Sequence, residues 1–453
     1  MKVVFVMRTS AHLRYHKSII ESLIERGHCV VMLYDPRFSE QKNIEKALSF
    51  SQTSGCELAP AVVPRGVRYW ILKHTRDLLS YRRYLINEAI EHLVPFRQDW
   101  KSHLPFLDRV WVKIPGGTRL LRTPWFATML GWLERVFPAD SRLMRDIKRY
   151  NPDVLVASPV NMRNSSTEFD YLKAAKAAGI PTVIQVLSWD NLTVRGLFHI
   201  HPDRVLCWNE VQAEEGRTHQ YLPPESIRVV GSPAFDAWFD HIKRSATPRD
   251  EFCRRYGLSP EYPLITYLGS ARNIARDETA TVRELREALS ASSDERVRRI
   301  QIALRVHPGN FRAYLDFSMQ GCVAVPPRGS LPDTEEALQL FHDTLAHSIA
   351  VVQVNTSGAI DAIIDGTPCI SLLYPEFASQ QVETIHFKQL MQSGATYLAE
   401  TPRACVAAIA RSIDGGDSQV AERKTFVASF IRPRGMERRA GEWAARELET
   451  IVL

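Results

Sequence analysis

The sequence contains no long run of apolar residues. Its first residues, MKVVFVMRTS, hold an apolar run of only five residues, from Val3 to Met7. A signal peptide needs a longer apolar stretch, and a membrane-spanning helix needs about 20 such residues. We therefore interpret this run as the first buried β-strand of a cytoplasmic protein.

Paired cysteines are also missing. The seven cysteines are scattered along the chain, and no two of them form a Cys-x-x-Cys pair. This pattern argues against a disulfide framework or a zinc site, and it favours a reducing compartment. The sequence has no Asp-x-Asp motif either. We therefore expect neither a bound metal ion nor a cofactor.

The charge is modest but unevenly distributed. The formal net charge is +6 over 453 residues, and residues 65–145 alone hold 15 Lys and Arg against 7 Asp and Glu. The remainder of the chain is therefore slightly acidic. No zinc-finger, RNP or helix-turn-helix pattern accompanies the basic residues, so nucleic acid is not an expected partner.

Strands and helices alternate through the first half of the chain. Residues 15–26 space their apolar side chains at helical intervals, Gly27 suits the end of that helix, and 28–33 is an apolar strand. Such a strand-helix-strand unit joins two parallel strands by a right-handed crossover. The pattern returns with strands at 153–157, 180–187, 204–208 and 227–230, and with helices at 168–178 and 210–219.

A second series of the same kind follows a polar hinge at 246–250. Its strands are expected at 263–268, 300–306, 322–325, 349–354 and 368–373. We predict an α/β fold with two doubly wound Rossmann-like domains, 1–240 and 250–425, that face a cleft. Residues 426–453 are expected to form a C-terminal helix that returns to the N-terminal domain. Ligands of such sheets bind beyond the carboxyl ends of the strands, which points to the cleft.

Residues 65–145 interrupt this pattern as a basic, helical insertion in the N-terminal domain. The insertion holds five of the nine tryptophans, with arginines between them. One interpretation is a helical subdomain whose basic residues coat a solvated face. The other is a peripheral membrane surface or a lipid-acceptor surface, because tryptophan and arginine suit the headgroup zone of anionic lipids.

The strongest candidate site lies at residues 355–358, between a strand and a helix. Free N–H groups at a helix start, together with the hydroxyls of Thr356 and Ser357, suit a diphosphate, and Gly358 permits close backbone approach. Asp361, one turn later, could accept hydrogen bonds from sugar or ribose hydroxyls. The alternative is that Asn355 and its neighbours only cap the helix.

Two further groups in the second half could assist this site. Arg305 and His307 are alternate residues at a predicted strand end, so they share one face, where they could neutralise a diphosphate leaving group. Ser270, in the loop after strand 263–268, could contact a phosphate or the base.

In the first half, polar residues follow two predicted strands. Arg8, Ser10 and His12 come after the first strand, and Asp190 and Asn191 follow strand 180–187. Asp190 is a candidate general base that would deprotonate an acceptor hydroxyl in an inverting transfer, and His12 is the competing base. We expect the other three residues to contact the acceptor. An Asx-type turn is the alternative role of residues 190–191.

These motifs resemble the GT-B superfamily. The resemblance is carried by Arg-x-His-Pro at 305–308 and by N-T-S-G-x-x-D-A-x-x-x-G-x-P at 355–368. It extends to bacterial surface-polysaccharide transferases of the CDP-glycerol glycerophosphotransferase-like and Kdo-transferase-like kinds. The runs VLSWDNLTVRGLFHIHPDRVLCWNEVQAEEG and IRVVGSPAFDAWFD also resemble uncharacterised bacterial glycosyltransferases. The resemblance covers residues 150–240 and 260–375 well, and it hardly extends to the insertion.

The resemblance implies roles for individual residues. Thr356, Ser357 and Gly358 would hold the donor phosphates, and Arg305 and His307 would assist the leaving group. The sugar or ribose would contact Asp361, where relatives often carry the longer glutamate, and this difference bears on the donor sugar. The chain has no convincing equivalent of the catalytic carboxylates of UDP-N-acetylglucosamine 2-epimerases, which share the architecture.

The implied function is metal-independent transfer of a sugar from a nucleotide-activated donor. The acceptor would be a bacterial surface glycan or a lipid-linked molecule of cell-envelope polysaccharide biosynthesis. The enzyme would act in the cytoplasm or peripherally at the inner face of the plasma membrane. Three alternatives stay open: a CDP-polyol phosphotransferase, a UDP-sugar 2-epimerase, and a non-catalytic protein that binds glycan or lipid.

Overall fold

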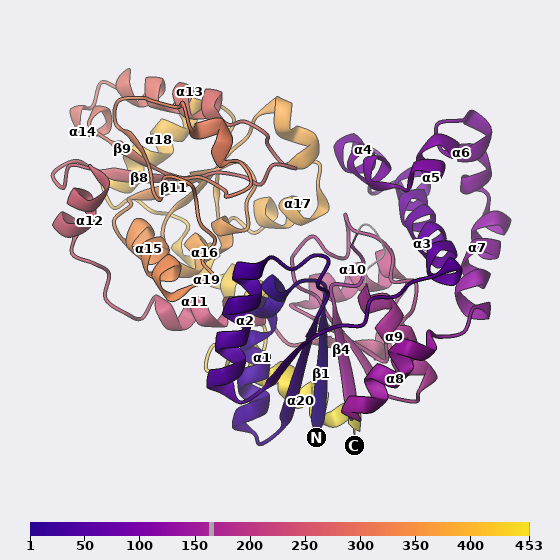
Figure 1. The fold of residues 1–453 in the computed structure, drawn as a ribbon. Coiled ribbons are helices and arrows are strands. Elements are labelled where there is room, and N and C mark those ends of the chain that lie inside the picture. Colours follow the sequence, from indigo (N-terminus) through magenta and orange to yellow (C-terminus); the bar gives the residue numbers. More distant parts are fainter. Residues whose placement is uncertain (163–166, 453) are drawn as a thin grey trace. The chain divides into compact units, whose positions relative to one another are not determined.

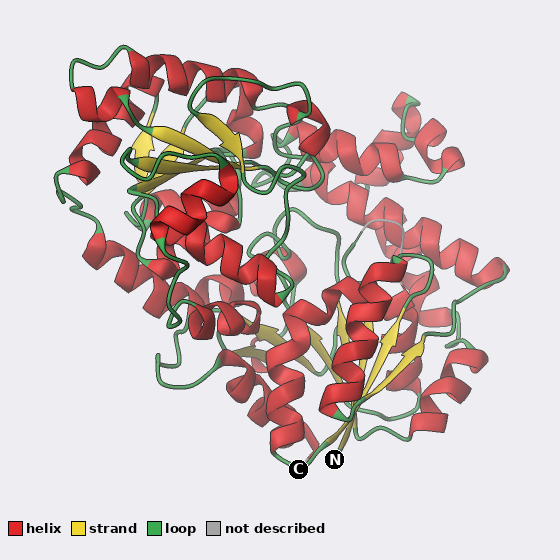
Figure 2. Cartoon of the chain, turned by 60° about the vertical axis from the view of Figure 1, so that its left-hand side comes forward, coloured by secondary structure: helices red, strands yellow, loops and turns green. Residues whose placement is uncertain are grey.

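Two parallel β-sheets organise the chain, one in each of two units. The computed structural model describes residues 1–162 and 167–452. Unit 1 comprises Met1–Asp236 and Ala428–Leu453, and unit 2 comprises Ala237–Val427. The sheets have seven and six strands, and helices lie on both faces of each sheet (Figure 2). This architecture confirms the expected α/β class.

The sheet of unit 1 is built around its first strand. Its order is β3-β2-β1-β4-β5-β6-β7, and each neighbouring pair is parallel. The chain order reverses between β1 and β4, which makes their carboxyl ends the topological switch point of this sheet. The strands are β1 (Lys2–Met7), β2 (Cys29–Tyr34), β3 (Glu57–Pro60), β4 (Val154–Ser158), β5 (Thr182–Gln185), β6 (Arg204–Cys207) and β7 (Ile227–Val229).

Alternate residues of β1 face two separate cores because successive side chains of a strand point to opposite faces. Val3 and Phe5 pack with α1 and α20, whereas Val4 and Val6 pack with α8 and α9. The chain's last helix lies beside α1 (Figure 1). The helices of this sheet are α1 (Leu13–Glu25), α2 (Gln41–Ser54), α8 (Ser141–Tyr150), α9 (Thr167–Ala177), α10 (Glu210–Gln220) and α20 (Ala440–Val452).

The basic insertion is helical, as predicted, and buried ion pairs fasten it to unit 1. Arg76, 1% exposed, donates to Glu134 at 2.8 and 2.9 Å and to Asp170 of α9 at 3.2 Å. The Arg83 guanidinium is also buried and donates to the backbone carbonyls of residues 192, 193 and 196. The insertion helices are α3 (Val67–Ile86), α4 (Val94–His103), α5 (Phe106–Trp111), α6 (Pro115–Arg122) and α7 (Pro124–Val136).

The sheet of unit 2 repeats the design with the order β10-β9-β8-β11-β12-β13, again parallel throughout. Its chain order reverses between β8 and β11, so the switch point lies at the carboxyl ends of these two strands. The strands are β8 (Leu264–Leu268), β9 (Gln301–Arg305), β10 (Cys322–Ala324), β11 (Ala350–Gln353), β12 (Cys369–Leu372) and β13 (Tyr397–Ala399).

Helices cover both faces of the unit 2 sheet. Ile265 and Tyr267 of β8 pack with α13 and α18, and Leu264 packs with α12 on the other face. The helices are α11 (Asp236–His241), α12 (Arg249–Tyr256), α13 (Thr279–Ser290), α14 (Glu295–Arg298), α15 (Glu335–Ala346), α16 (Gly358–Asp365), α17 (Ile385–Gln392), α18 (Pro402–Ile413) and α19 (Val420–Phe426). Among the helices of residues 1–162 and 167–452, none is both long and apolar enough to cross a bilayer.

Candidate functional site

The predicted residues of unit 2 meet at its switch point. β8 leads into Ser270, and β11 leads into the turn at residues 355–358, which begins α16. The two segments are bonded, because the Asn355 N–H donates to Ser270 Oγ at 3.3 Å. Arg305 is the last residue of β9, which neighbours β8. The carboxyl ends of three adjacent strands therefore carry the predicted residues.

The turn before α16 satisfies most of its own N–H groups. The Gly358 N–H donates to Thr356 Oγ1 at 3.3 Å, and the N–H groups of Ala359 and Ile360 donate to the carbonyls of Thr356 and Ser357. The expectation of free N–H groups at this helix start is therefore wrong for these three residues. What the turn offers an anion is the helix dipole and the exposed Ser357 hydroxyl, which makes no capping bond within the described chain.

Packing explains the glycine and the aspartate of this motif. A Cβ on Gly358 would stand 3.3 Å from Leu268 Cδ1, at the end of β8, so the two strand ends approach closely here. Asp361 lies in the first turn of α16, where a carboxylate suits the helix dipole, and its backbone carbonyl accepts from Trp238 Nε1 at 2.9 Å. Its charge acts on the nearby Arg305 guanidinium.

Arg305 is a buried cation with an unused donor. The residue is 7% exposed, its guanidinium lies 4.7 Å from the Phe341 ring centroid, and Nη2 donates to Ser330 Oγ at 3.4 Å. Nη1 is buried and has no hydrogen-bond partner among the described residues. Burial lowers the pKa of Arg305 to about 10. An anion that accepted a hydrogen bond from Nη1 would supply the missing partner and would offset the cost of burying the positive charge.

His307 is oriented by its own loop. The Gly309 N–H donates to His307 Nδ1 at 3.0 Å, so in the neutral ring Nε2 carries the hydrogen. His307 therefore presents Nε2–H as a hydrogen-bond donor. In the structure the ring is half-buried.

Ser270 is buried beneath the surface of the site and bonds to two neighbouring segments. Its side chain is 0% exposed, and its Oγ and N–H donate to Glu278 at 3.1 and 2.7 Å. The Tyr267 hydroxyl donates to the same carboxylate at 3.1 Å. The predicted donor contact at Ser270 is therefore replaced by a positioning role, because this hydroxyl joins the β8 loop to the Asn355 turn. Sequence reasoning missed Glu278, which lies in a charged stretch with no pattern of its own.

Because of the buried Glu278, we expect the stability of unit 2 to depend on pH. Burial raises its pKa from 4.5 to about 7, so between these values the folded state binds more protons than the unfolded state. We expect stability to fall by about 3 kcal/mol as the pH rises through this window, and Glu278→Gln to remove the slope. Urea unfolding of both proteins from about pH 5 to pH 8 measures this difference. Equal slopes would show that another group is responsible.

The switch point of unit 1 holds Arg8, Ser10 and His12. Arg8 lies over the Phe38 ring at 4.1 Å, and burial lowers its pKa, opposed by Glu168 and Asp35. Nη1 of Arg8 and the hydroxyl of Ser10 are buried without hydrogen-bond partners in the described chain. Both are polar groups that an acceptor could satisfy.

His12 ends the short 3₁₀ turn that precedes α1. Its Nδ1 has no hydrogen-bond partner among the described residues. Burial lowers the pKa of His12 well below its usual value, and the nearby His16, Arg14 and Arg8 lower it further. The imidazole is therefore neutral near pH 7, the protonation state that a general base requires.

Asp190 and Asn191 lie one strand away from this switch point, after β5. The Asp190 carboxylate pairs with Arg195 at 2.8 Å. The Asn191 side-chain oxygen accepts from the N–H groups of Leu187 and Ser188, both at 3.0 Å. Asn191 therefore closes a turn, and the predicted acceptor contact at this residue is replaced by a structural role.

Three charged residues near Arg8 were not predicted. Asp35 follows β2, is fully buried, and pairs with Arg37 at 2.7 Å. Glu168, in the first turn of α9, is also fully buried and acts electrostatically on Arg8. The position of Asp35 directly after an apolar strand was the one signal available, whereas the sequence does not show which helix brings Glu168 to Arg8.

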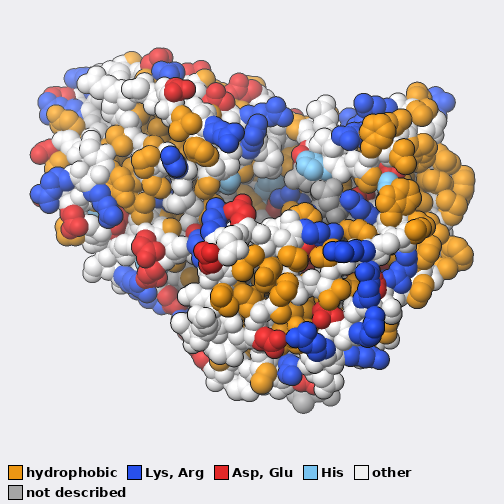
Figure 3. All heavy atoms as spheres, in the orientation of Figure 1, with side chains coloured by type: hydrophobic (Ala, Val, Ile, Leu, Met, Phe, Trp, Pro, Cys, Tyr) orange, Lys and Arg blue, Asp and Glu red, His pale blue; other side chains and the backbone are white. Residues whose placement is uncertain are grey.

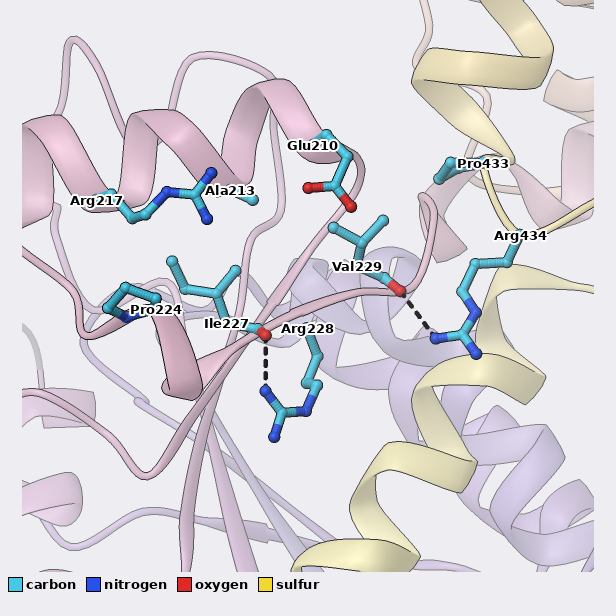
Figure 4. A pocket seen from close by; sticks show the side chains of 9 residues that line it. All are labelled: Glu210, Ala213, Arg217, Pro224, Ile227, Arg228, Val229, Pro433 and Arg434. Atoms are coloured by element: carbon cyan, nitrogen blue, oxygen red, sulfur yellow. Dashed lines mark hydrogen bonds between the residues drawn. The ribbon is translucent and has the colours of Figure 1, made fainter.

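A hollow of about 430 Å³ lies elsewhere in unit 1, between α10 and the edge strand β7 (Figure 4). None of the predicted site residues lines it. Its basic groups are engaged: Arg217 pairs with Glu214, and Arg228 and Arg434 donate to backbone carbonyls of β7. The contacts of Arg228 and Arg434 are made to the edge strand β7, and the pair of Arg217 lies within α10. Within the described ranges, no three metal-ligating side chains gather at one place.

Comparison with known sequences gives one informative relative. No family model matches the chain. The lipid-A-disaccharide synthase of Koribacter versatilis (strain Ellin345) is 24% identical over 249 residues. The match covers 54% of this chain and 58% of that protein, so the chain aligns with little more than half the length of this relative.

Comparison with solved structures covers nearly the whole chain. The S. aureus MnaA–UDP co-structure superposes with a TM-score of 0.55 at 10% identity and covers 100% of this chain and 96% of its own. UDP-GlcNAc 2-epimerase from Methanocaldococcus jannaschii gives 0.54 at 12%, covering 99% and 100%. A glycosyltransferase from Rickettsia africae ESF-5 gives 0.52 at 10%, covering 100% and 97%. The chain therefore has the GT-B fold that its motifs predicted.

Proposed function

We propose that the protein is a glycosyltransferase that uses a nucleotide-activated sugar. The observation that carries this proposal is the buried Arg305 Nη1, which has no hydrogen-bond partner among the described residues. Arg305 is the last residue of β9, and Ser357 lies at the start of α16, at the same edge of the sheet. A diphosphate would accept hydrogen bonds from both groups and would lie at the positive end of α16. The UDP-bound neighbour and the lipid-A-disaccharide synthase match support a nucleotide-sugar substrate.

In the proposed reaction, unit 2 stabilises the leaving nucleoside diphosphate. When the glycosidic carbon–oxygen bond to the diphosphate breaks, negative charge develops on the phosphate oxygens. Arg305, the Nε2–H of His307 and the α16 dipole would stabilise that charge. Asp361, one helical turn later, would accept hydrogen bonds from sugar or ribose hydroxyls. We propose that these groups act without a metal ion.

In the proposed reaction, unit 1 activates the acceptor. We propose that His12 removes the proton of the acceptor hydroxyl, because its neutral imidazole has an unused nitrogen at a switch point. Asp190 is the second candidate, and its pairing with Arg195 makes it the weaker one. Arg8 and Ser10 would orient the acceptor, which we propose is a surface glycan or a lipid-linked saccharide of bacterial envelope biosynthesis.

UDP-sugar 2-epimerisation is the second candidate function, favoured by the epimerases among the structural neighbours. It differs from transfer in needing no acceptor. Incubation of the protein with UDP-GlcNAc alone, followed by NMR of the sugar, distinguishes the two. A C2 epimer would establish the epimerase, whereas transfer predicts an unchanged donor until an acceptor is added.

Donor binding is tested by ligand-induced thermal stabilisation. We expect UDP-, CMP- or GDP-linked sugars to raise the melting temperature, with one nucleotide class far more effective than the others. Ser357→Ala should cut the affinity about tenfold through the lost hydroxyl contact. Ser293→Ala removes another exposed serine of unit 2 and should behave as the wild type. If neither variant changes the shift, the donor does not bind at the α16 turn.

A further inference from the structure

The insertion of unit 1 exposes an unusual number of large apolar side chains. Phe106, Leu107, Trp125 and Trp132 are 69%, 61%, 62% and 56% exposed. In Figure 3 apolar side chains gather over the region that Figure 1 labels α5, α6 and α7, interspersed with Lys and Arg. We call this surface the α5–α7 face and define it by Phe106, Leu107, Val110, Ile114, Trp125, Met129, Trp132 and Val136.

The pattern within α7 shows that this exposure is a property of one helix face. Trp125, Met129, Trp132 and Val136 are spaced by four, three and four residues, which places them in one stripe along the helix. The inner side of α7 instead buries Leu130 and Glu134. The helix therefore points an apolar stripe outward, where an ordinary surface helix presents polar side chains.

The inner side of α7 is firmly held. Glu134 accepts from Arg76 at 2.8 Å and from Lys173 of α9 at 3.0 Å, and these cations lower the pKa of Glu134 to about 2 against the effect of burial. Such a buried pair is lost only at considerable cost in free energy. The exposed stripe is thus fixed in place by the anchored side of the same helix.

The charge around this face has a single sign. Between residues 101 and 138 the two carboxylates are Asp108 and Glu134, and both are buried and paired inward, with His74 and with Arg76. The exposed charges are all cations: Lys113, Arg119, Arg122 and Arg135. No carboxylate of the described chain forms an ion pair with any of these four residues.

We propose that the α5–α7 face docks onto the surface of an anionic phospholipid bilayer. Tryptophan and phenylalanine side chains would enter the headgroup region, and the four cations would contact lipid phosphates. A second copy of the chain fits less well, because two-fold pairing of this face would bring its cations together with no anion between them. The docking would hold the acceptor residues of unit 1 near lipid-linked acceptors, and in that respect it rests on the proposed function.

Vesicle flotation of the full-length protein tests the docking. Vesicles of phosphatidylcholine alone are compared with vesicles that also contain phosphatidylglycerol. We expect flotation with the anionic vesicles, weakened by high salt. Trp125→Ser combined with Trp132→Ser should lower the apparent affinity at least about tenfold, and Arg119→Glu combined with Arg122→Glu should abolish the preference for anionic lipid.

Matched controls lie in unit 2. Leu315→Ser with Leu398→Ser removes two comparably exposed apolar residues, 60% and 45% exposed, and Arg254→Glu with Arg255→Glu reverses two exposed cations. Both controls should float as the wild type does. Equal losses in the controls, or no flotation of the wild type with anionic vesicles, would overturn the proposal.

Two further measurements keep the outcomes distinct. Self-association by sedimentation velocity that is lost in the tryptophan double variant, without vesicle binding, would identify a second copy as the occupant and would also overturn the proposal. The nucleotide-induced thermal shift of the tryptophan double variant should equal that of the wild type. Wild-type protein that shows the thermal shift but does not float with anionic vesicles refutes this inference alone, whereas wild-type protein that floats but shows no shift refutes the donor site alone.

Discussion

Arg305→Met is expected to stabilise the unliganded protein and to abolish nucleotide-sugar binding. Burial lowers the pKa of Arg305 to about 10 and leaves Nη1 without a partner among the described residues. Below that pH the charged group costs the folded state about 3 kcal/mol, with the attraction to Asp361 already included in this figure. Methionine is apolar and comparable in length. Part of the gain is offset because the contact with Phe341 and the hydrogen bond to Ser330 are lost, so we expect a net gain of about 1–2 kcal/mol.

Urea unfolding without ligand and melting curves with donor measure the two effects separately. Arg312→Met removes an exposed arginine of unit 2 and should change neither quantity. A destabilised Arg305→Met protein that still binds donor would show that the guanidinium is structural. The opposite signs of the expected effects make this variant informative, because a general folding defect lowers both stability and binding.

His12→Asn is expected to remove most of the transfer rate while leaving donor binding intact. Loss of a general base typically costs about 10²–10⁴-fold in rate. Asp190→Asn should cost less than about tenfold, because its carboxylate is paired with Arg195. The measurement is nucleotide release from the stabilising donor in the presence of a lipid-linked glycan extract, with the donor-induced thermal shift as the control.

The pH profile adds an independent test of His12. Because burial, His16, Arg14 and Arg8 hold the pKa of His12 well below its usual value, the base stays deprotonated at neutral pH. The transfer rate should therefore stay level as the pH falls from about 8 to 6.5 and decline only in more acidic solution. A large loss in Asp190→Asn with an active His12→Asn protein would reverse the assignment.

The strands and their order of appearance were predictable because both faces of each sheet are buried. β4 (VLVAS) and β8 (LITYL) are apolar but for one small hydroxyl residue each and the tyrosine of β8, and every residue in them is buried. Prediction failed where an element buries few apolar side chains. The helix α2 fully buries only Ala47 and Ser51, so its apolar periodicity is too weak to recognise.

The positions of the site residues were more predictable than their roles. Residues after parallel strands meet at one edge of a sheet, so Arg305, Ser270 and the Asn355 turn could be placed together. Their hydrogen bonds depend on partners that no local pattern connects to them. Ser270 bonds Glu278, and the Asn355 side chain donates to the carbonyl of Gln380 at 2.5 Å. These partners turn two predicted contact residues into supports of the turn.

We propose that a nucleoside diphosphate binds at the switch point of unit 2. This binding can be measured by hydrogen exchange and mass spectrometry on the full chain, with UDP, CDP and GDP added in turn. We expect one nucleotide to slow exchange at residues 354–361 and 305–309, and Arg305→Met to lose this protection. Protection confined to the hollow at residues 210–229, or no protection with any of the three nucleotides, would contradict it.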